Sequence, residues 1–210
     1  MIRIIVMLCV CLLGLPAMAA ETPDAALAGL QQAIDTKDAG LLEKYIDVRG
    51  VIAKGVDAFI ADFAKHPPSG EGDPLLEMLS GGLAAESGQA VANPMKELLV
   101  EETRKFVLWG VASGNFSGSP SLRQPVQDGG LLSALFADAS IARKELRSIR
   151  CAAPKGDLAT ASAKLYDHGS ERSYPVQVRL KRQPEGHWKV TEVSNIRDLI
   201  TTVRKEAEAR

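Results

Sequence analysis

The stretch RLKRQPEGHWKVTEVSNIRDLI, residues 179–200, most constrains the fold because the spacing of its hydrophobic residues changes within it. Before the change, apolar residues alternate with polar ones: Tyr174, Val176, Val178, Leu180, Trp188 and Val190. A period of two is typical of antiparallel strands with one buried face. After the change, apolar residues recur at helical spacing: Ile196, Leu199, Ile200 and Val203. We therefore expect a hairpin and then a terminal helix, begun by Asn195 as its cap, with these four side chains buried.

The segments before the hairpin show the same alternation, in one case less regularly. They are Ala159, Ala161, Ala163 and Leu165, preceded by a weaker strand at residues 141–151. Pro184 stands where a type I turn favours proline, and Gly186 stands where the chain must reverse. Arg179, Lys181 and Lys189 fall on the opposite face from the apolar residues. The sequence therefore predicts an antiparallel meander with a cationic outer face.

Helical spacing dominates the first half of the chain. Thr22-Pro23-Asp24 has the composition of a helix start, and two more short amphipathic helices follow on either side of Asp47. The clearest helix has Asn93 as its cap, Pro94 in its first turn and Gly110 at its end. Shorter helical segments are expected at residues 75–83 and 131–136. Helices followed by antiparallel strands indicate an α+β fold.

The chain opens with MIRIIVMLCVCLLGLPAMAAETPD, which has the order of a secretory signal peptide. Arg3 precedes an apolar run, Pro16 ends the run, and Ala17-Met18-Ala19 forms a cleavage site that leaves Ala20 first. The alternative is an uncleaved anchor, but a spanning helix needs roughly 20 apolar residues and this run is shorter. No later segment is long and apolar enough to span a bilayer. We expect a signal peptide at residues 1–19 and a periplasmic or secreted product.

The remaining chain, residues 20–210, is long enough for a single α+β domain with its own core. We expect a helical part at residues 20–112, a Gly-, Ser- and Pro-rich loop at 113–130, and the sheet with its terminal helix at 131–210. Cleavage leaves Cys151 as the single cysteine, so no disulfide can form within the mature chain. Its apolar neighbours favour a small buried hydrophobe over a reactive thiol.

Charge is distributed unevenly along the mature chain. Residues 20–140 carry 9 Lys and Arg against 17 Asp and Glu, whereas residues 141–210 carry 15 against 9. Such asymmetry either marks a surface for anions or reflects solvated faces that differ by chance. Acidic proteins and anionic lipid head groups are the partners it suggests. We expect no nucleic-acid partner, since export separates the protein from nucleic acid.

Motifs that would carry catalysis are missing from the sequence. His66, His168 and His187 lie in loop or turn sequences, and no HExxH, CxxC, GxSxG or phosphate-binding glycine loop occurs. The sequence therefore predicts a protein that is not an enzyme and uses no metal or cofactor.

Glu102 is the most unusual polar residue of the helical part because it falls on an apolar helix face. The other members of that face are Met95, Leu98, Leu99, Phe106 and Trp109. A carboxylate there is either paired near the rim of the core or faces a wet cavity. Trp188 likewise either packs the sheet against the helices or lines an apolar pocket with Glu102, Trp109, Tyr174 and Val176. These five residues are our candidate ligand-binding site.

Helices followed by a meander whose last strand carries WKVTEV resemble the nuclear-transport-factor-2-like superfamily, in which helices pack on a cone-shaped sheet. LQQAIDTKDAGLLEKYIDVRGV is similar to the opening of an uncharacterised family of exported bacterial domains of unknown function. GHWKVTEVSNIRDLITTVRKE resembles the ending of periplasmic phospholipid-shuttle proteins of the toluene-tolerance auxiliary family. A terminal helix departs from the simplest transport-factor-like pattern, which ends on a strand.

Three functions are compatible with this sequence. The favoured one is an exported, non-enzymatic binding or interaction domain for a small apolar ligand or a protein partner. The first alternative is a periplasmic phospholipid shuttle, which the terminal resemblance implies. The second is a pocket enzyme of the same superfamily, in which Glu102 acts as general acid or base with a raised pKa.

Overall fold

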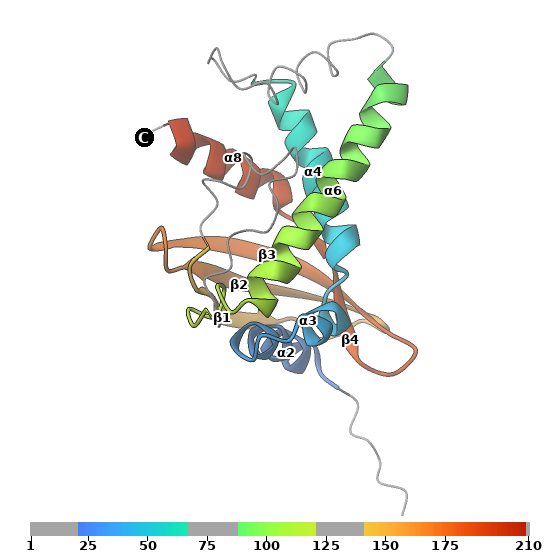
Figure 1. Ribbon diagram of the computed structural model, residues 1–210. Coiled ribbons are helices and arrows are strands. Elements are labelled where there is room, and N and C mark those ends of the chain that lie inside the picture. The colour runs from blue at the N-terminus through green and yellow to red at the C-terminus, as the bar shows by residue number, and fades with distance from the viewer. Residues whose placement is uncertain (1–20, 67–87, 121–140, 209–210) are drawn as a thin grey trace, which may run out of the picture.

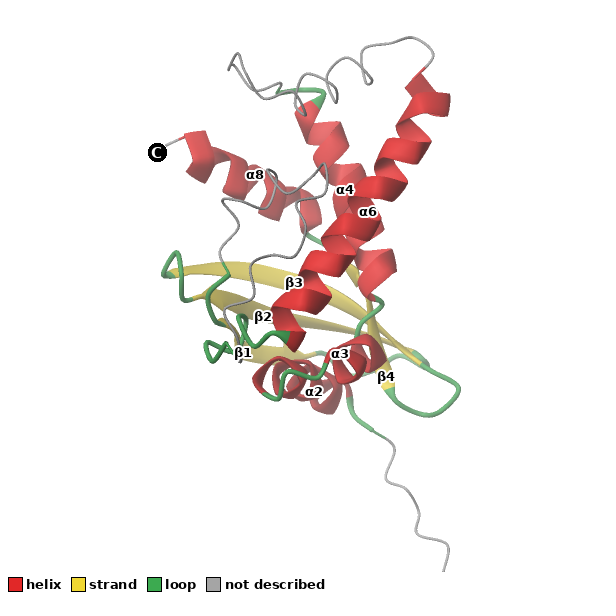
Figure 2. Cartoon of the chain, viewed as in Figure 1, coloured by secondary structure: helices red, strands yellow, loops and turns green. Residues whose placement is uncertain are grey.

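The structure, a computed structural model, describes residues 21–66, 88–120 and 141–208. The expected signal peptide, the segments at residues 75–83 and 131–136 and most of the loop at 113–130 lie outside these ranges. Within the described residues the chain forms helices α2 (Pro23–Asp35), α3 (Ala39–Tyr45), α4 (Val48–Phe63), α6 (Gly88–Ala112) and α8 (Ile196–Glu208). The strands are β1 (Lys144–Cys151), β2 (Leu158–Asp167), β3 (Arg172–Arg182) and β4 (Trp188–Val193). Figures 1 and 2 show helices packed on an open antiparallel sheet, which confirms the α+β class and the C-terminal helix.

The three N-terminal helices begin at side chains that cap them, and the sequence predicted the first of these starts, at Thr22. The Thr22 hydroxyl accepts a hydrogen bond from the Ala25 N–H at 3.2 Å, with Pro23 in the first turn. The Asp38 carboxylate accepts from the Leu41 N–H at 2.8 Å, and the Asp47 carboxylate accepts from the Gly50 N–H at 3.0 Å. Each cap satisfies one of the N–H groups that a helix start leaves without a partner.

The long helix α6 differs from its prediction at both ends. It begins at Gly88, so Pro94 lies inside the helix and Asn93 is not its cap. It also continues through Gly110 to Ala112, and Gly114, at φ +80°, follows its end. Gly110 is there for close packing, because a Cβ atom at this position would overlap the ring of Phe116. The glycine therefore marks a close contact rather than a helix end.

The sheet is a meander in the order β1-β2-β3-β4, with each neighbouring pair antiparallel. The hairpin between β3 and β4 has the predicted turn, in which the Gly186 N–H donates to the Gln183 carbonyl at 2.9 Å and Gly186 has φ +91°. Its register places Trp188 opposite Arg182. A bulge interrupts β1 between Arg147 and Arg150, where Ser148 has φ +52°. This irregularity explains the weak alternation of residues 141–151.

The outer edge of β1 is bound to groups from elsewhere in the chain. The Lys144 N–H donates to the Phe116 carbonyl at 2.9 Å. The Leu146 N–H donates to the side-chain oxygen of Gln31 on α2 at 2.7 Å. Two of the backbone donors that an edge strand exposes are therefore satisfied without a further strand.

One face of the sheet and the apolar faces of the first three helices form the main core. Its buried members include Leu27, Leu30, Leu42, Val48, Ala161, Val178, Leu180, Trp188 and Val190. Burial of each large apolar side chain stabilises the fold by about 1.5–3 kcal/mol. A second cluster joins α4 to α6, which run side by side and extend beyond the sheet (Figure 1): Val56, Phe63, Leu99 and Val100.

The C-terminal helix α8 packs against α4 and β3, but less deeply than predicted. Ile196, Leu199 and Ile200 are half-buried, whereas Val203 is 53% exposed. Ionic contacts supplement this packing, since Arg204 binds Asp62 of α4 at 2.9 Å. Glu206 binds Arg172 at 2.7 Å and accepts a hydrogen bond from the Tyr174 hydroxyl at 2.9 Å, both on β3. The helix is therefore held by an apolar stripe together with charged side chains.

The side chain of Asn195 was predicted to cap α8, but it forms its hydrogen bonds with β3 instead. Its amide nitrogen donates to the Pro175 carbonyl at 2.8 Å, and its oxygen accepts from the Gln177 N–H at 2.9 Å. Both groups belong to the part of β3 that precedes Val178, where β3 no longer pairs with β4. The asparagine thus satisfies donors and acceptors that the shorter strand leaves open.

Candidate functional site

The structure separates the aromatic members of the predicted ligand site. Tyr174 lies near the start of β3, whereas Trp188 pairs with Arg182 at its other end. Eight residues of strand separate Tyr174 from Arg182, which corresponds to about 26 Å. Val176 is half-buried beside the Tyr174 end. Tyr174 and Trp188 therefore do not line one cavity.

The two predicted site residues on α6 have separate local environments. Glu102 binds Lys105, one turn along the same helix, at 2.8 Å, and its side chain is 25% exposed. Trp109 packs against Phe106 with ring centroids 6.0 Å apart. Its indole N–H is buried and has no hydrogen-bond partner among the described residues. Glu102 thus has the paired environment that was one of its two predicted alternatives.

Trp188 has the environment of a packing residue. It is fully buried in the main core, and Arg182 lies over its ring at 4.9 Å. Its indole N–H donates to the carbonyl of Glu21 at 2.8 Å, just ahead of α2. The predicted cleavage before Ala20 would leave this acceptor in the mature chain.

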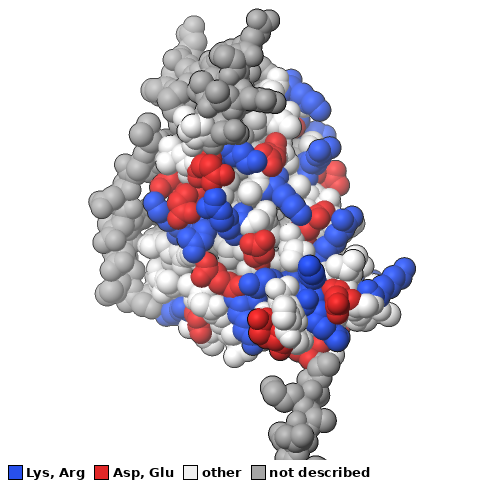
Figure 3. Space-filling model, turned by 90° about the vertical axis from the view of Figure 1, so that its right-hand side faces the viewer, with Lys and Arg blue, Asp and Glu red and all other residues white. Residues whose placement is uncertain are grey.

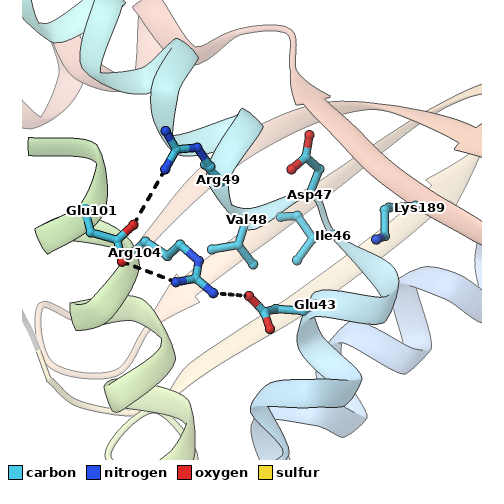
Figure 4. A pocket seen from close by; sticks show the side chains of 8 residues that line it. All are labelled: Glu43, Ile46, Asp47, Val48, Arg49, Glu101, Arg104 and Lys189. Atoms are coloured by element: carbon cyan, nitrogen blue, oxygen red, sulfur yellow. Dashed lines mark hydrogen bonds and ion pairs between the residues drawn. The ribbon is translucent and has the colours of Figure 1, made fainter. Parts of the chain in front are cut away.

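A pocket of about 350 Å³ lies where α3, α4, α6 and β4 meet (Figure 4). Its lining residues are Glu43, Ile46, Asp47, Val48, Arg49, Glu101, Arg104 and Lys189. Arg104 points between two carboxylates and binds Glu43 at 2.7 Å and Glu101 at 3.4 Å. Arg49 binds Glu97 at 2.5 Å and lies 3.7 Å from Glu101. We call this set of side chains the ion-pair pocket.

The charges of the ion-pair pocket balance one another. Its lining contains three acidic side chains and three basic ones. The hydrogen bond with Glu43, followed by the charges of Glu43 and Glu101, raises the pKa of the Arg104 guanidinium against the opposing effect of its burial. An anion that binds Arg49 or Arg104 would have to displace one of these carboxylates. Figure 3 shows the same pattern over this side of the molecule, where acidic and basic side chains are interspersed. The pocket therefore joins α3, α4 and α6 electrostatically and has little capacity left for an ion.

The opposite face of the sheet has a different charge balance. We define the outer face as the strand side chains that point away from the buried core residues. On β2 the buried Ala159, Ala161 and Ala163 alternate with the exposed Thr160, Ser162 and Lys164. The strand register places six basic residues on the outer face, Arg147, Arg150, Lys164, Arg179, Lys181 and Lys189, and two acidic ones, Glu145 and Glu192. The outer face therefore carries an excess of positive charge.

Both carboxylates of the outer face are already paired. Glu145 binds Arg147 at 2.6 Å and His168 at 3.0 Å. Hydrogen bonds from these two side chains lower the pKa of Glu145 to about 2. Glu192 binds Lys54 of α4 at 3.0 Å, and this contact is the main cause of its lowered pKa. Arg150, Lys164 and Lys181 have no ion-pair partner among the described residues.

Sequence reasoning found only part of this face. Arg179, Lys181 and Lys189 lie on the outer face as predicted, and Lys189, on the edge strand, also lines the ion-pair pocket. The contribution of β1 was missed because the bulge at Ser148 breaks its alternation. Residues 141–151 are rich in basic side chains, and this composition was the available signal.

Cys151 packs at the margin of the main core and is only partly buried. Desolvation, followed by a hydrogen bond with Asp24, raises the pKa of its thiol to about 12. This environment favours the unreactive alternative, because the thiolate is the nucleophilic form.

The described residues contain no group of three or more His, Cys, Asp or Glu side chains placed to hold a metal ion. None of the helices among them is both long enough and apolar enough to cross a membrane. Comparisons with models of protein families, with curated proteins and with solved structures find no match. The family resemblances therefore remain predictions.

Proposed function

We propose that the protein is an exported, non-enzymatic binding domain that docks an acidic segment of a partner protein on the outer face. The observation that carries this proposal is the excess of positive charge without ion-pair partners, among the described residues, on this exposed face of the sheet. Arg150, Lys164 and Lys181 are exposed and have no ion-pair partner in the described part of the chain. Complementary charge both speeds the encounter with an acidic partner and selects against basic ones.

The ion-pair pocket gives less support to a binding function. Its guanidinium groups are engaged by carboxylates of this chain at distances down to 2.5 Å. An anion that binds these guanidinium groups must first break such a contact, and this loss offsets the free energy gained by binding. An anion that binds the lysines of the outer face displaces only water and salt ions. An anionic partner therefore gains more on the outer face.

The hypothesis of a small apolar ligand required the five predicted site residues to line one pocket. The separation of Tyr174 from Trp188 removes the geometric basis of that pocket. The pairing of Glu102 with Lys105 likewise gives no particular support to acid–base chemistry. For these reasons we favour the protein partner over the small apolar ligand.

Fluorescence anisotropy with a labelled, end-capped decaglutamate peptide tests the proposal. We expect binding that weakens steeply between 50 and 200 mM salt, because surface charges are screened over about 10 Å at 0.1 M. The double variant Lys164→Glu/Lys181→Glu should weaken binding at least tenfold. Lys65→Glu/Lys205→Glu is the matched control, since it changes the net charge equally at exposed positions on α8 and just after α4.

Equal losses from the two double variants would refute the outer face as the docking surface. Vesicles containing phosphatidylglycerol provide the second measurement. Binding to these vesicles without binding to the peptide would overturn the protein partner in favour of a lipid surface.

A further inference from the structure

The outer face contains a hollow of about 420 Å³ over the middle of the sheet. Its lining residues are Arg150, Ala152, Thr160, Ala161, Ser162, Gln177, Val178, Arg179 and Ser194. Arg150 and Arg179 contribute guanidinium groups to the lining, and Thr160 and Ser162 contribute hydroxyl groups. We call this feature the arginine hollow.

The strand register explains why the surface is hollow at this point. Ser162 on β2 lies between Arg150 on β1 and Gln177 on β3. Thr160, two residues along β2, lies opposite Arg179 on β3. The central strand thus presents two short hydroxyl side chains, while longer side chains stand on both sides. The floor of the hollow is made of hydroxyl groups and its walls carry guanidinium groups.

The donors in the arginine hollow are largely unused. Arg150 has no ion-pair partner, and the hydroxyls of Thr160 and Ser162 make no hydrogen bond, among the described residues. Arg179 is 61% exposed and is 3.6 Å from Glu192, which is bound more closely by Lys54 at 3.0 Å. By contrast, Arg49 and Arg104 of the ion-pair pocket have carboxylate contacts of 2.5 and 2.7 Å. The hollow can therefore receive an anion without loss of a short ion pair.

We propose that the arginine hollow binds a single carboxylate group of the acidic partner segment, held by the guanidinium of Arg150 and the hydroxyls of Thr160 and Ser162. This inference rests on the proposed function and names the anchor point within it. A guanidinium presents two parallel N–H groups that match the two oxygens of a carboxylate. The hydroxyls donate to the remaining lone pairs.

The charge around the hollow favours a carboxylate over a phosphate group. Glu192 pairs with Arg179 in the adjoining row of the sheet, so one guanidinium is already partly neutralised. Lys54 shares the Glu192 carboxylate, so the neutralisation of Arg179 is only partial, and Arg150 is the guanidinium of the hollow that has no ion-pair partner among the described residues. A phosphate dianion would bring a second negative charge towards Glu192.

Titration with the labelled decaglutamate peptide also tests the hollow when one residue is changed at a time. Arg150→Ala should weaken binding about tenfold or more, because a hydrogen bond to a charged group is lost together with the charge. Lys164→Ala is the matched control, since it removes one positive charge from the same face outside the hollow and should weaken binding only two- to threefold. Arg150→Lys should not restore affinity, because lysine lacks the paired donors.

The outcomes separate this inference from the proposed function. If Arg150→Ala and Lys164→Ala weaken binding equally, the outer face is a diffuse electrostatic surface and the hollow is not an anchor. If Lys164→Glu/Lys181→Glu leaves binding unchanged, the docking surface itself is wrong. Competition by acetate and by inorganic phosphate at equal ionic strength decides the ligand class, and stronger competition by phosphate would overturn the carboxylate assignment. Each of these side chains is exposed, so unchanged melting temperatures should accompany the substitutions.

Discussion

Removal of the Asp167 carboxylate should destabilise the protein more than removal of an exposed carboxylate such as that of Asp57. Its carboxylate binds the Lys144 ammonium at 2.6 Å, and the two side chains are only 10% and 16% exposed. It also accepts hydrogen bonds from the Gly169 N–H and the Ser170 hydroxyl, both at 3.0 Å. Asp167→Ala would leave the part-buried Lys144 ammonium without this carboxylate and the turn between β2 and β3 without its acceptor.

The magnitude follows from the burial of the pair. Breaking a buried ion pair by removing one partner costs about 3–5 kcal/mol. A loss near 4 kcal/mol corresponds to a melting temperature lower by about 8–16 °C for a domain of this size. Asp57→Ala is the matched control, because Asp57 binds Lys96 at the same 2.6 Å but is 57% exposed. An exposed pair contributes about 1 kcal/mol or less.

Urea denaturation followed by circular dichroism measures both variants against the unchanged protein. Adding Lys144→Met to Asp167→Ala should recover part of the lost stability, because it removes the ammonium left without Asp167. Equal losses of unfolding free energy in Asp167→Ala and Asp57→Ala would refute the proposed role of burial. A double variant Asp167→Ala/Lys144→Met that is less stable than Asp167→Ala would also refute it.

Three further predictions concern the pH dependence, the thiol and the packing of α6. The stability that Glu145 adds through Arg147 and His168 should be complete above its ordinary pKa of 4.5 and disappear as the pH falls through about 2, and Glu145→Gln should abolish this part of the pH profile. Cys151 in the folded protein should react with a disulfide reagent at pH 8 at least a hundredfold slower than in urea, where the thiol regains an ordinary pKa; equal rates would contradict its raised pKa. Gly110→Ala should lower the free energy of unfolding by about 1–3 kcal/mol in urea titrations, since the added methyl group overlaps an aromatic ring; an unchanged midpoint would show that the ring can move aside.

The features that the sequence predicted well depend on neighbours in the chain. Thr22 begins α2, as predicted, by accepting a hydrogen bond from an N–H group three residues away. Pro184 and Gly186 form their turn with residues of the same hairpin. Such local signals do not require knowledge of the packing, and the elements they define are present at the expected places.

The predictions that failed depend on contacts across the fold. Gly110 continues α6 because Phe116 packs against it, although glycine commonly ends a helix. Asn195 bonds to the backbone of β3 because β4 is shorter than its neighbour. In both cases a tertiary contact gives the residue a different role from its local preference.

The candidate site shows the same limit. Alternation placed Tyr174 and Trp188 on one face of the sheet, but a shared face does not determine distance along a strand. Counting back from the turn at Pro184 pairs Trp188 with Arg182 and separates it from Tyr174, so this signal was available in the sequence. The arginine hollow was not predictable in this way, because its β1 member, Arg150, follows a bulge.

The side chain of Gln31 determines where hydrogen bonding in the sheet stops. Its amide oxygen occupies the Leu146 N–H, and its nitrogen approaches the Lys144 carbonyl at 3.5 Å. A glutamine side chain here imitates the peptide group of one more strand without supplying a chain that could continue. A second copy of the protein would therefore find these backbone groups of β1 already occupied, which opposes edge-to-edge polymerisation through this part of the strand.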